Sequence, residues 1–82
     1  MWDQRLNAAY AKIMKVASPE VKASLKSAQR AWIEFRDDTC SANALLFQGG
    51  THASLIMAGC MGTQTAVRSL QLEQFLIEVE FQ

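Results

Sequence analysis

The stretch SPEVKASLKSAQRAWIEFRDDTCSANALLFQGG, residues 18–50, contains the start signal, the apolar repeat and the end signal of one long helix. Ser18 can cap a helix, Pro19 is tolerated in the first turn, and the pair Gly49–Gly50 favours a helix end followed by a turn. This stretch predicts a helix from Pro19 to about Phe47. Its apolar or small residues recur at intervals of four and three and predict one packing seam: Val21, Leu25, Ala28, Trp32, Phe35, Thr39, Ala42 and Leu46.

The segment after the glycine pair repeats these intervals and predicts a second long helix, to about Ile77. Residues 75–82, FLIEVEFQ, alternate apolar and acidic side chains and therefore also suit a strand. The expected seam of this helix comprises Ile56, Cys60, Thr63, Val67, Leu70, Gln74, Ile77 and Phe81.

An antiparallel hairpin that turns at the glycine pair would bring residues whose numbers sum to about 100 to the same level. The pairs expected to lie level are Cys40 with Cys60, Phe35 with Thr65, Trp32 with Arg68, and Leu25 with Phe75.

Upstream, residues 3–17 place Leu6, Tyr10, Ile13 and Ala17 at intervals of 4, 3 and 4 and predict a short amphipathic helix. No repeat, linker or low-complexity run divides the chain. We therefore expect a single all-α domain over residues 1–82, with a short first helix followed by a long antiparallel helical hairpin.

Composition excludes several classes of protein. The 82 residues carry eight basic and eight acidic side chains, and this zero balance argues against a nucleic-acid-binding domain. No apolar run reaches the length of about 18 residues typical of a transmembrane segment. The charges are nevertheless unevenly distributed along the chain. Residues 1–36 have seven basic and three acidic side chains (+4), and residues 37–82 have one basic and five acidic side chains (−4).

The two cysteines, Cys40 and Cys60, have 19 residues between them and allow three interpretations. They could form a disulfide, belong to a metal site, or be unrelated buried thiols. Their level placement in the hairpin favours the disulfide, whereas the residues alone leave two reduced thiols in a cytosolic hairpin as the simpler interpretation.

Other chemistry finds little support. A zinc site needs about four ligands, and beyond the cysteines only His52 and carboxylates such as Asp37 and Asp38 are available. A lone loop histidine is usually solvated, and adjacent helical carboxylates point about 100° apart and do not face each other. The glycine pair lacks the spacing and the lysine of a phosphate-binding loop. We expect no metal, no cofactor and no enzyme.

The run AQRAWIEFRDDTC, residues 28–40, is the densest polar and aromatic part of the chain. One interpretation is a helix with Trp32 and Phe35 in the core and solvated ion pairs one turn apart on its outer face. Another is that Arg36 and Asp37 hold the hairpin tip by contacting the glycine loop or the first helix.

This run, followed by the glycine pair and preceded by D-x-x-L-N-x-x-Y at residues 3–10, resembles the LprI-type lysozyme-inhibitor domain of bacterial envelope proteins over about residues 3–72. Ala58, Cys60, Thr65 and Arg68 fit the same pattern. The resemblance implies an exported, periplasmic or envelope-associated helical domain with a Cys40–Cys60 disulfide. The recurrent residues of the family fall, beside the cysteines and glycines, on Leu6, Asn7, Tyr10, Gln29, Arg30, Trp32, Phe35, Arg36, Asp37, Thr65 and Arg68.

Members of this family usually carry a signal peptide and an N-terminal piece before the D-x-x-L-N motif, so we expect the chain to lack that segment. The apolar surface that such a truncation would uncover makes a homodimer or a helix exchange a further expectation.

We expect the domain to bind lysozyme or a related cell-wall hydrolase. Vertebrate-type lysozymes are basic, and acidic side chains would speed the encounter. The expected contact residues are Asp37, Asp38, Phe47, Gln48, Gly49, Gly50, Thr51 and His52. The alternative is a structural, self-associating envelope domain without inhibitory activity.

Overall fold

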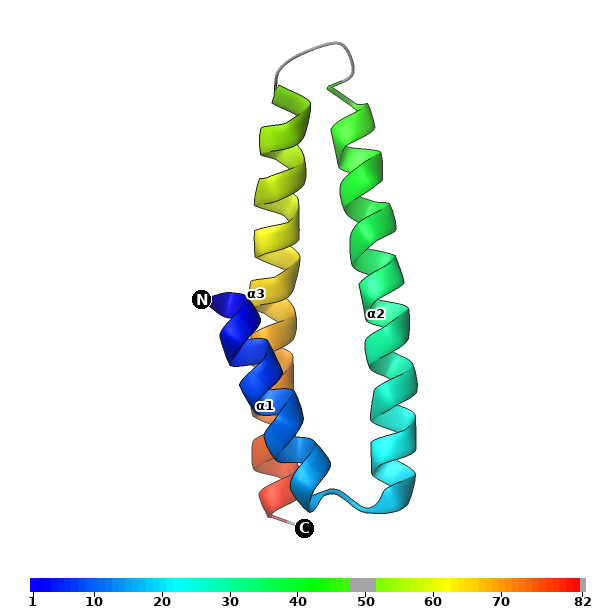
Figure 1. The fold of residues 1–82 in the computed structure, drawn as a ribbon, viewed down its shortest axis with the longest axis vertical. Helices are drawn as coiled ribbons and strands as arrows, with labels where there is room; N and C mark the ends of the chain where they lie inside the picture. Colours follow the sequence, from blue (N-terminus) through cyan, green and yellow to red (C-terminus); the bar gives the residue numbers. More distant parts are fainter. Residues whose placement is uncertain (48–51, 82) are drawn as a thin grey trace.

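The computed structural model describes residues 1–47 and 52–81 as three helices: α1 (Trp2–Val16), α2 (Pro19–Leu45) and α3 (His52–Glu80). Helices α2 and α3 run antiparallel as a long hairpin, and α1 lies along the half of α3 nearest the C-terminus (Figure 1). The molecule measures 50 × 22 × 14 Å. The expected all-α architecture is confirmed.

The start of α2 follows the expected chemistry. Ser18 takes an extended conformation, and its hydroxyl accepts a hydrogen bond from the amide of Val21 at 3.2 Å. Pro19 occupies the first turn, where its missing N–H costs nothing, and Glu20 complements the positive end of the helix dipole. Ala17 is also extended and is buried, so the chain reverses direction between α1 and α2 within two residues.

The other boundaries differ slightly from expectation. Helix α2 ends at Leu45, two residues before Phe47, while α3 continues beyond Ile77 to Glu80. The strand considered for residues 75–82 is therefore wrong over the described part. Phe75, Leu76 and Val79 pack against the core, and this helical spacing outweighs the local alternation of apolar and acidic residues.

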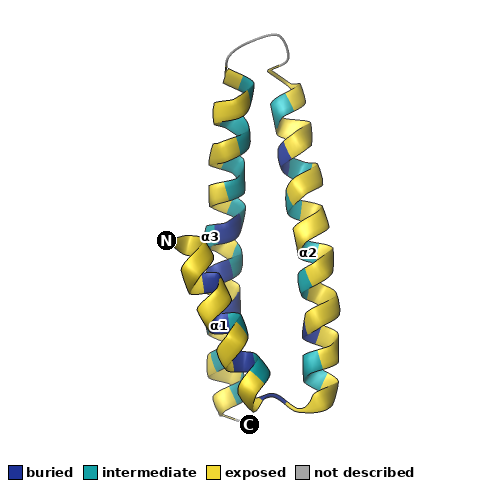
Figure 2. Ribbon diagram, viewed as in Figure 1, coloured by how far each residue is buried: buried dark blue, intermediate teal, exposed yellow. Residues whose placement is uncertain are grey.

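The apolar core lies mainly between α1 and α3. Figure 2 shows most of the buried residues on these two helices, with few on α2. Ile13 of α1 is fully buried and Leu72 of α3 is 1% exposed. The core cluster contains Leu6, Ala9, Ile13, Ala17, Leu25 and Leu72, and Tyr10, Met14, Val21, Trp32, Phe75, Leu76 and Val79 pack around it.

The seam expected on α3 is wrong beyond Cys60. Thr63, Val67, Leu70, Gln74, Ile77 and Phe81 are all exposed. Thr65, Ser69 and Leu72 are buried in their place. The hydroxyl oxygen of Ser69 lies 2.9 Å from the carbonyl oxygens of both Trp2 and Thr65. This face of α3 packs against α1. The expected seam is wrong because it assumes that α3 packs only against α2.

The seam expected on α2 is also partly wrong. Val21 and Leu25 face the core, but Phe35 is 58% exposed, and Ala28, Ala42 and Leu46 are exposed as well. Gln29, Trp32, Arg36 and Cys40 lie on the inward side instead. A strict seven-residue repeat drifts by about 20° per repeat around a straight helix, so a stripe chosen by intervals alone leaves the contact face over four repeats.

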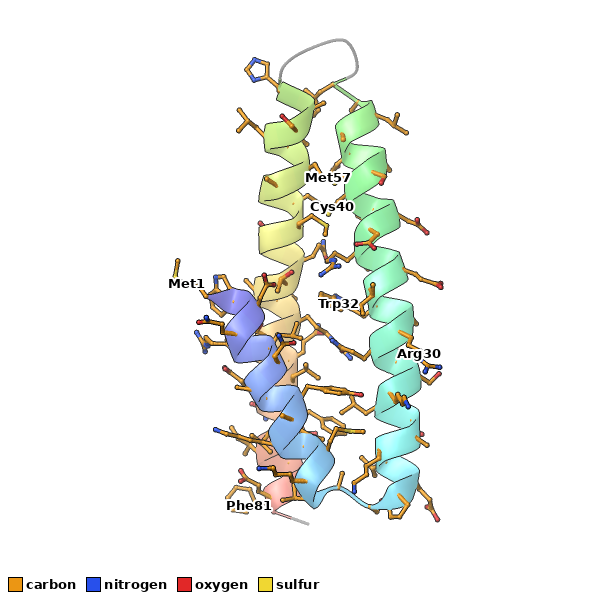
Figure 3. The ribbon with its side chains drawn as sticks, viewed as in Figure 1. Met1, Arg30, Trp32, Cys40, Met57 and Phe81 are labelled. Carbon is orange, nitrogen blue, oxygen red and sulfur yellow. A yellow bond between two sulfur atoms is a disulfide. The ribbon has the colours of Figure 1, made fainter. Side chains whose placement is uncertain are left out.

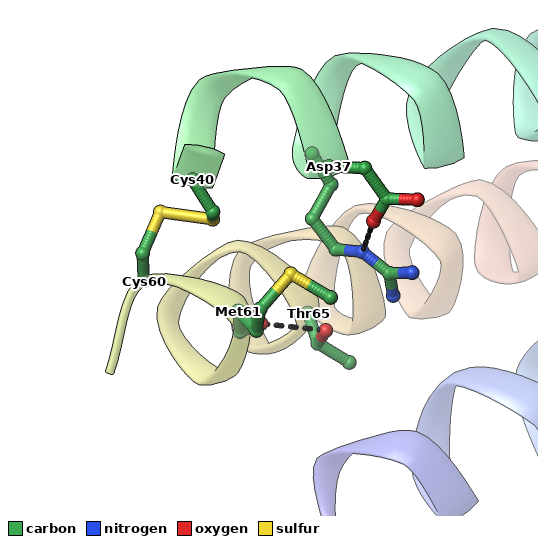
Figure 4. Close-up of a disulfide and its surroundings, with 6 residues drawn as sticks. Asp37, Cys40, Cys60, Met61 and Thr65 are labelled. Atoms are coloured by element: carbon green, nitrogen blue, oxygen red, sulfur yellow. Dashed lines mark hydrogen bonds and ion pairs between the residues drawn. A yellow bond between two sulfur atoms is a disulfide. The ribbon is translucent and has the colours of Figure 1, made fainter. Parts of the chain in front are cut away.

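The residue pairs expected to lie level across the hairpin agree with the structure better than the expected seams do. Cys40 and Cys60 form a disulfide with their Cα atoms 5.5 Å apart, and Figure 4 shows the bond joining α2 to α3. Leu25 and Phe75 meet at the core, whereas the exposed Phe35 does not face the buried Thr65. Closing a loop of this length stabilises a fold by about 3 kcal/mol in the chain-entropy model.

The corrected register of α3 can be tested with two leucines that lie two residues apart. Leu72→Ala should lower the free energy of unfolding by about 2–5 kcal/mol because it empties a fully packed site. Leu70→Ala, at a side chain 52% exposed, should cost no more than about 1 kcal/mol. Urea unfolding followed by circular dichroism measures both, and equal costs would contradict the register.

An ion pair ties α1 to α3 and predicts a pH effect. Arg5 Nη2 lies 2.7 Å from Glu73 Oε1 and its Nε lies 3.0 Å from Oε2, and these hydrogen bonds lower the pKa of Glu73. A lowered folded-state pKa adds stability above the unfolded pKa, about 4.3, that is lost as the pH falls through the folded value. The extra stability of the wild type over Glu73→Gln should thus be present at pH 7 and vanish in strong acid. Urea unfolding across this range measures it, and a difference independent of pH would refute the linkage.

Candidate functional site

A groove opens between α1 and α2. Helix α1 packs along α3 and makes only slight contact with α2, so the space between the two is not closed by side chains. The groove has a volume of about 620 Å³. Its lining consists of Asp3, Leu6, Asn7 and Tyr10 from α1, Lys26, Gln29, Arg30, Trp32, Ile33 and Arg36 from α2, and Thr65 from α3.

Helical spacing explains why these residues meet. Asp3, Asn7 and Tyr10 follow one another at intervals of four and three and share one face of α1. Lys26, Ile33 and Arg36 recur at intervals of seven and three and share one face of α2. Each row lies beside the core-facing row of its helix, so the two rows form the opposite walls of the groove. Figure 3 shows Trp32 projecting from α2 towards the other two helices.

Arg36 has the most constrained cation of the groove. Its guanidinium lies over the Trp32 ring, 4.9 Å from the ring centroid, and its Nε donates a hydrogen bond to Asp37 Oδ1 at 3.1 Å (Figure 4). The side chain is only 20% exposed. Asp37 thus pairs with its own neighbour, and among the described residues this pair forms no hydrogen bond or ion pair with α1. The ion pairs expected one turn apart in residues 28–40 are not formed either.

Next to the groove, Arg68 links α3 to α2 by a side-chain hydrogen bond. Its Nε donates to Gln29 Oε1 at 3.0 Å, and its Nη1 donates to Gln71 Oε1 at 3.2 Å. Partial burial lowers the pKa of Arg68, but a guanidinium stays charged in proteins. The nearby Thr65 hydroxyl donates to the carbonyl of Met61 at 2.7 Å, so it is committed within its own helix. On α2, Arg68 thus bonds Gln29, which lies about one helical turn from Trp32, its expected level partner.

None of the described residues expected to bind a partner lines this groove, although Asp37 bonds Arg36 at its edge. Asp37 and Asp38 are exposed on α2, and Phe47 and His52 are exposed at the far end of the hairpin. Gln48, Gly49, Gly50 and Thr51 lie outside the described residues.

The residues expected to form the structural motif are instead concentrated at the groove. Eight of them line it, namely Leu6, Asn7, Tyr10, Gln29, Arg30, Trp32, Arg36 and Thr65. Phe35 and Arg68 are the two that do not. Sequence reasoning missed the contributions of Lys26 and Ile33, whose only signal was their spacing of three or four residues from Gln29 and Arg30.

Apolar, basic and amide side chains make up most of the lining of the groove. Its lining contains a single carboxylate, from Asp3, and no histidine, cysteine or serine. Across residues 1–47 and 52–81, no three histidine, cysteine or acidic side chains gather as metal ligands. Over the same residues, no helix combines the length and hydropathy that crossing a membrane requires.

Comparison with known proteins places the chain in a family. The family described as "Lysozyme inhibitor LprI" matches residues 1–72. A protein of Rhizobium meliloti (strain 1021), named "Uncharacterized protein R02472", is 33% identical over 57 residues, which are 70% of this chain and 41% of that protein. No solved structure matches the chain. The match over residues 1–72 covers all of α1 and α2 and most of α3, and the chain belongs to the LprI lysozyme-inhibitor family.

Proposed function

We propose that the chain is an exported, envelope-associated domain that inhibits lysozyme or a related cell-wall hydrolase by binding to it. The family match over residues 1–72 is the observation that carries this proposal. The disulfide supports export, because such bonds persist in oxidising compartments and are rare in the cytosol.

The far end of the hairpin is the contact surface we favour. Helix α1 covers only the other half of α3, so this end stands clear of the core (Figure 1). Residues 39–67 contain no lysine, arginine, aspartate or glutamate. Burying this part of the chain against a partner would therefore cost little charge desolvation. Among the described residues nearest the turn, the large apolar side chains that are exposed are Leu45, Leu46, Phe47 and Leu55.

Asp37 and Asp38 stand just below this uncharged end and would meet the basic rim of a lysozyme. Charges at the edge of an interface mainly accelerate association, and salt screens them. In this arrangement the apolar tip supplies the affinity and the two carboxylates raise the rate of encounter.

A lysozyme activity assay tests the proposal. The wild type at micromolar concentration should inhibit, and added salt should weaken the inhibition. The double variant Leu46→Asp, Leu55→Asp should weaken it by about tenfold or more, because it places two charges in the apolar contact.

The matched control is Val16→Asp with Phe81→Asp, two exposed apolar positions at the opposite end of the molecule. It should inhibit like the wild type. No inhibition by the wild type at micromolar concentration would overturn the function, and equal losses in the two double variants would overturn the assigned surface.

A structural, self-associating envelope domain is the second candidate. The exposed stripe of α3 favours it, since Val67, Leu70, Ile77 and Phe81 share the spacing of a helix-packing seam but have no partner among the described residues. A stripe with this spacing can pair antiparallel with the same stripe of a second copy about a two-fold axis.

Light scattering over a wide range of concentration tests this second candidate. The wild type should shift from monomer to dimer as concentration rises, and Leu70→Glu with Ile77→Glu should stay monomeric because both charges would fall in the contact. Lys12→Glu with Lys15→Glu, on the exposed side of α1, is the control for added negative charge. A wild type that stays monomeric throughout would exclude the homodimer.

A further inference from the structure

We propose that the groove between α1 and α2 is a binding site for a small organic acid, which presents its carboxylate to Arg36. This inference is separate from lysozyme inhibition, because it concerns the groove and not the hairpin tip, and a small ligand in place of a protein.

The charge of the groove is the first observation. Lys26, Arg30 and Arg36 line it together with one acid, Asp3, and Asp37 pairs with Arg36 at its edge, so a chain of zero net charge has a local excess of one positive charge here. Neither Lys26 nor Arg30 forms an ion pair within the described residues. Clefts lined by one sign of charge concentrate ligands of the opposite sign.

Arg36 supplies the specific contact. Its Nε is occupied by Asp37, and its Nη1 and Nη2 have no hydrogen-bond partner among the described residues. No buried side-chain nitrogen or oxygen in that part of the chain lacks a partner, so these two nitrogens reach solvent. The Trp32 ring and the Asp37 carboxylate hold the guanidinium in place. A fixed fork with free terminal N–H groups matches a carboxylate, and its ordering costs little on binding.

The remaining lining indicates an organic ligand and not a bare inorganic ion. Leu6, Tyr10, Trp32 and Ile33 contribute apolar surface, which a phosphate ion would leave uncovered. The amide of Asn7, exposed on the α1 wall, can bond a hydroxyl or amide of the same ligand. A volume of about 620 Å³ accommodates a sugar acid or a short acidic peptide.

Titration of the whole chain with four probes tests the inference. Two probes carry a carboxylate: N-acetylmuramic acid and the dipeptide alanyl-glutamate. N-acetylglucosamine is the neutral control, since it has the same sugar ring without the lactyl carboxylate, and inorganic phosphate is the control for a bare anion. Amide chemical shifts locate each probe, and in Trp2→Phe the fluorescence of Trp32 reports on the groove alone, because the chain has two tryptophans.

We expect at least one carboxylate probe to shift the amides of Asn7, Ile33 and Arg36, and the preferred one distinguishes a sugar acid from a peptide. N-acetylglucosamine and phosphate should bind at least tenfold more weakly. Added salt should weaken the binding of the acid. No shift at these amides with either acid, or equal binding of phosphate, would overturn the proposal.

Two charge-matched variants locate the site further. Lys26→Gln with Arg30→Gln should weaken binding of the acid by about fivefold for each charge removed, since both exposed side chains stand on the α2 wall. Lys12→Gln with Lys15→Gln removes the same charge from α1 outside the groove and should leave the affinity unchanged. Arg36→Lys should weaken binding although it keeps the charge, because the fork is lost. If the two double variants weakened binding equally, the effect would depend on the net charge of the chain alone, and the proposal that the acid binds in the groove would be refuted.

Discussion

The packing of α1 against α3 is the contact on which the rest of the fold depends. A two-helix hairpin buries little apolar surface, and here α2 contributes only Leu25 and Cys40 to the buried residues. Leu6, Ala9 and Ile13 of α1 supply the other side of the core around Leu72. Because α1 is short and lies on α3, its packing leaves a groove towards α2 and leaves the other end of the hairpin to be held by the disulfide.

Helix positions and hairpin pairing could be predicted from the sequence because their signals are local. The cap at Ser18 and the intervals of three and four located the helices, and one assumed turn brought Cys40 level with Cys60. The rotation of each helix about its axis could not be predicted in this way. On α3 it depends on where α1 lies, since the buried Ser69 bonds the carbonyl of Trp2. On α2 it follows from the drift of the seven-residue repeat, which leaves Phe35 exposed.

The groove could not be predicted from the sequence for a related reason. Its two walls are rows that lie beside the core-facing rows, and their recurrence in the family pattern was equally compatible with a structural role. Only the weak contact between α1 and α2 turns residues such as Asn7 and Arg36 into the lining of an open site. The net charge of the chain also hides local differences. It is zero, yet the chain has a cationic groove and a long stretch without formally charged side chains.

The position of the disulfide has a consequence for proteolysis. Cys40 and Cys60 enclose the whole far end of the hairpin, so a protease that cuts any single peptide bond between them produces two fragments that remain covalently joined. Each fragment keeps its share of the core, since Leu25 lies before the cut and Leu72 after it. The end of the molecule that reaches furthest from the core can therefore be nicked without separating the polypeptide.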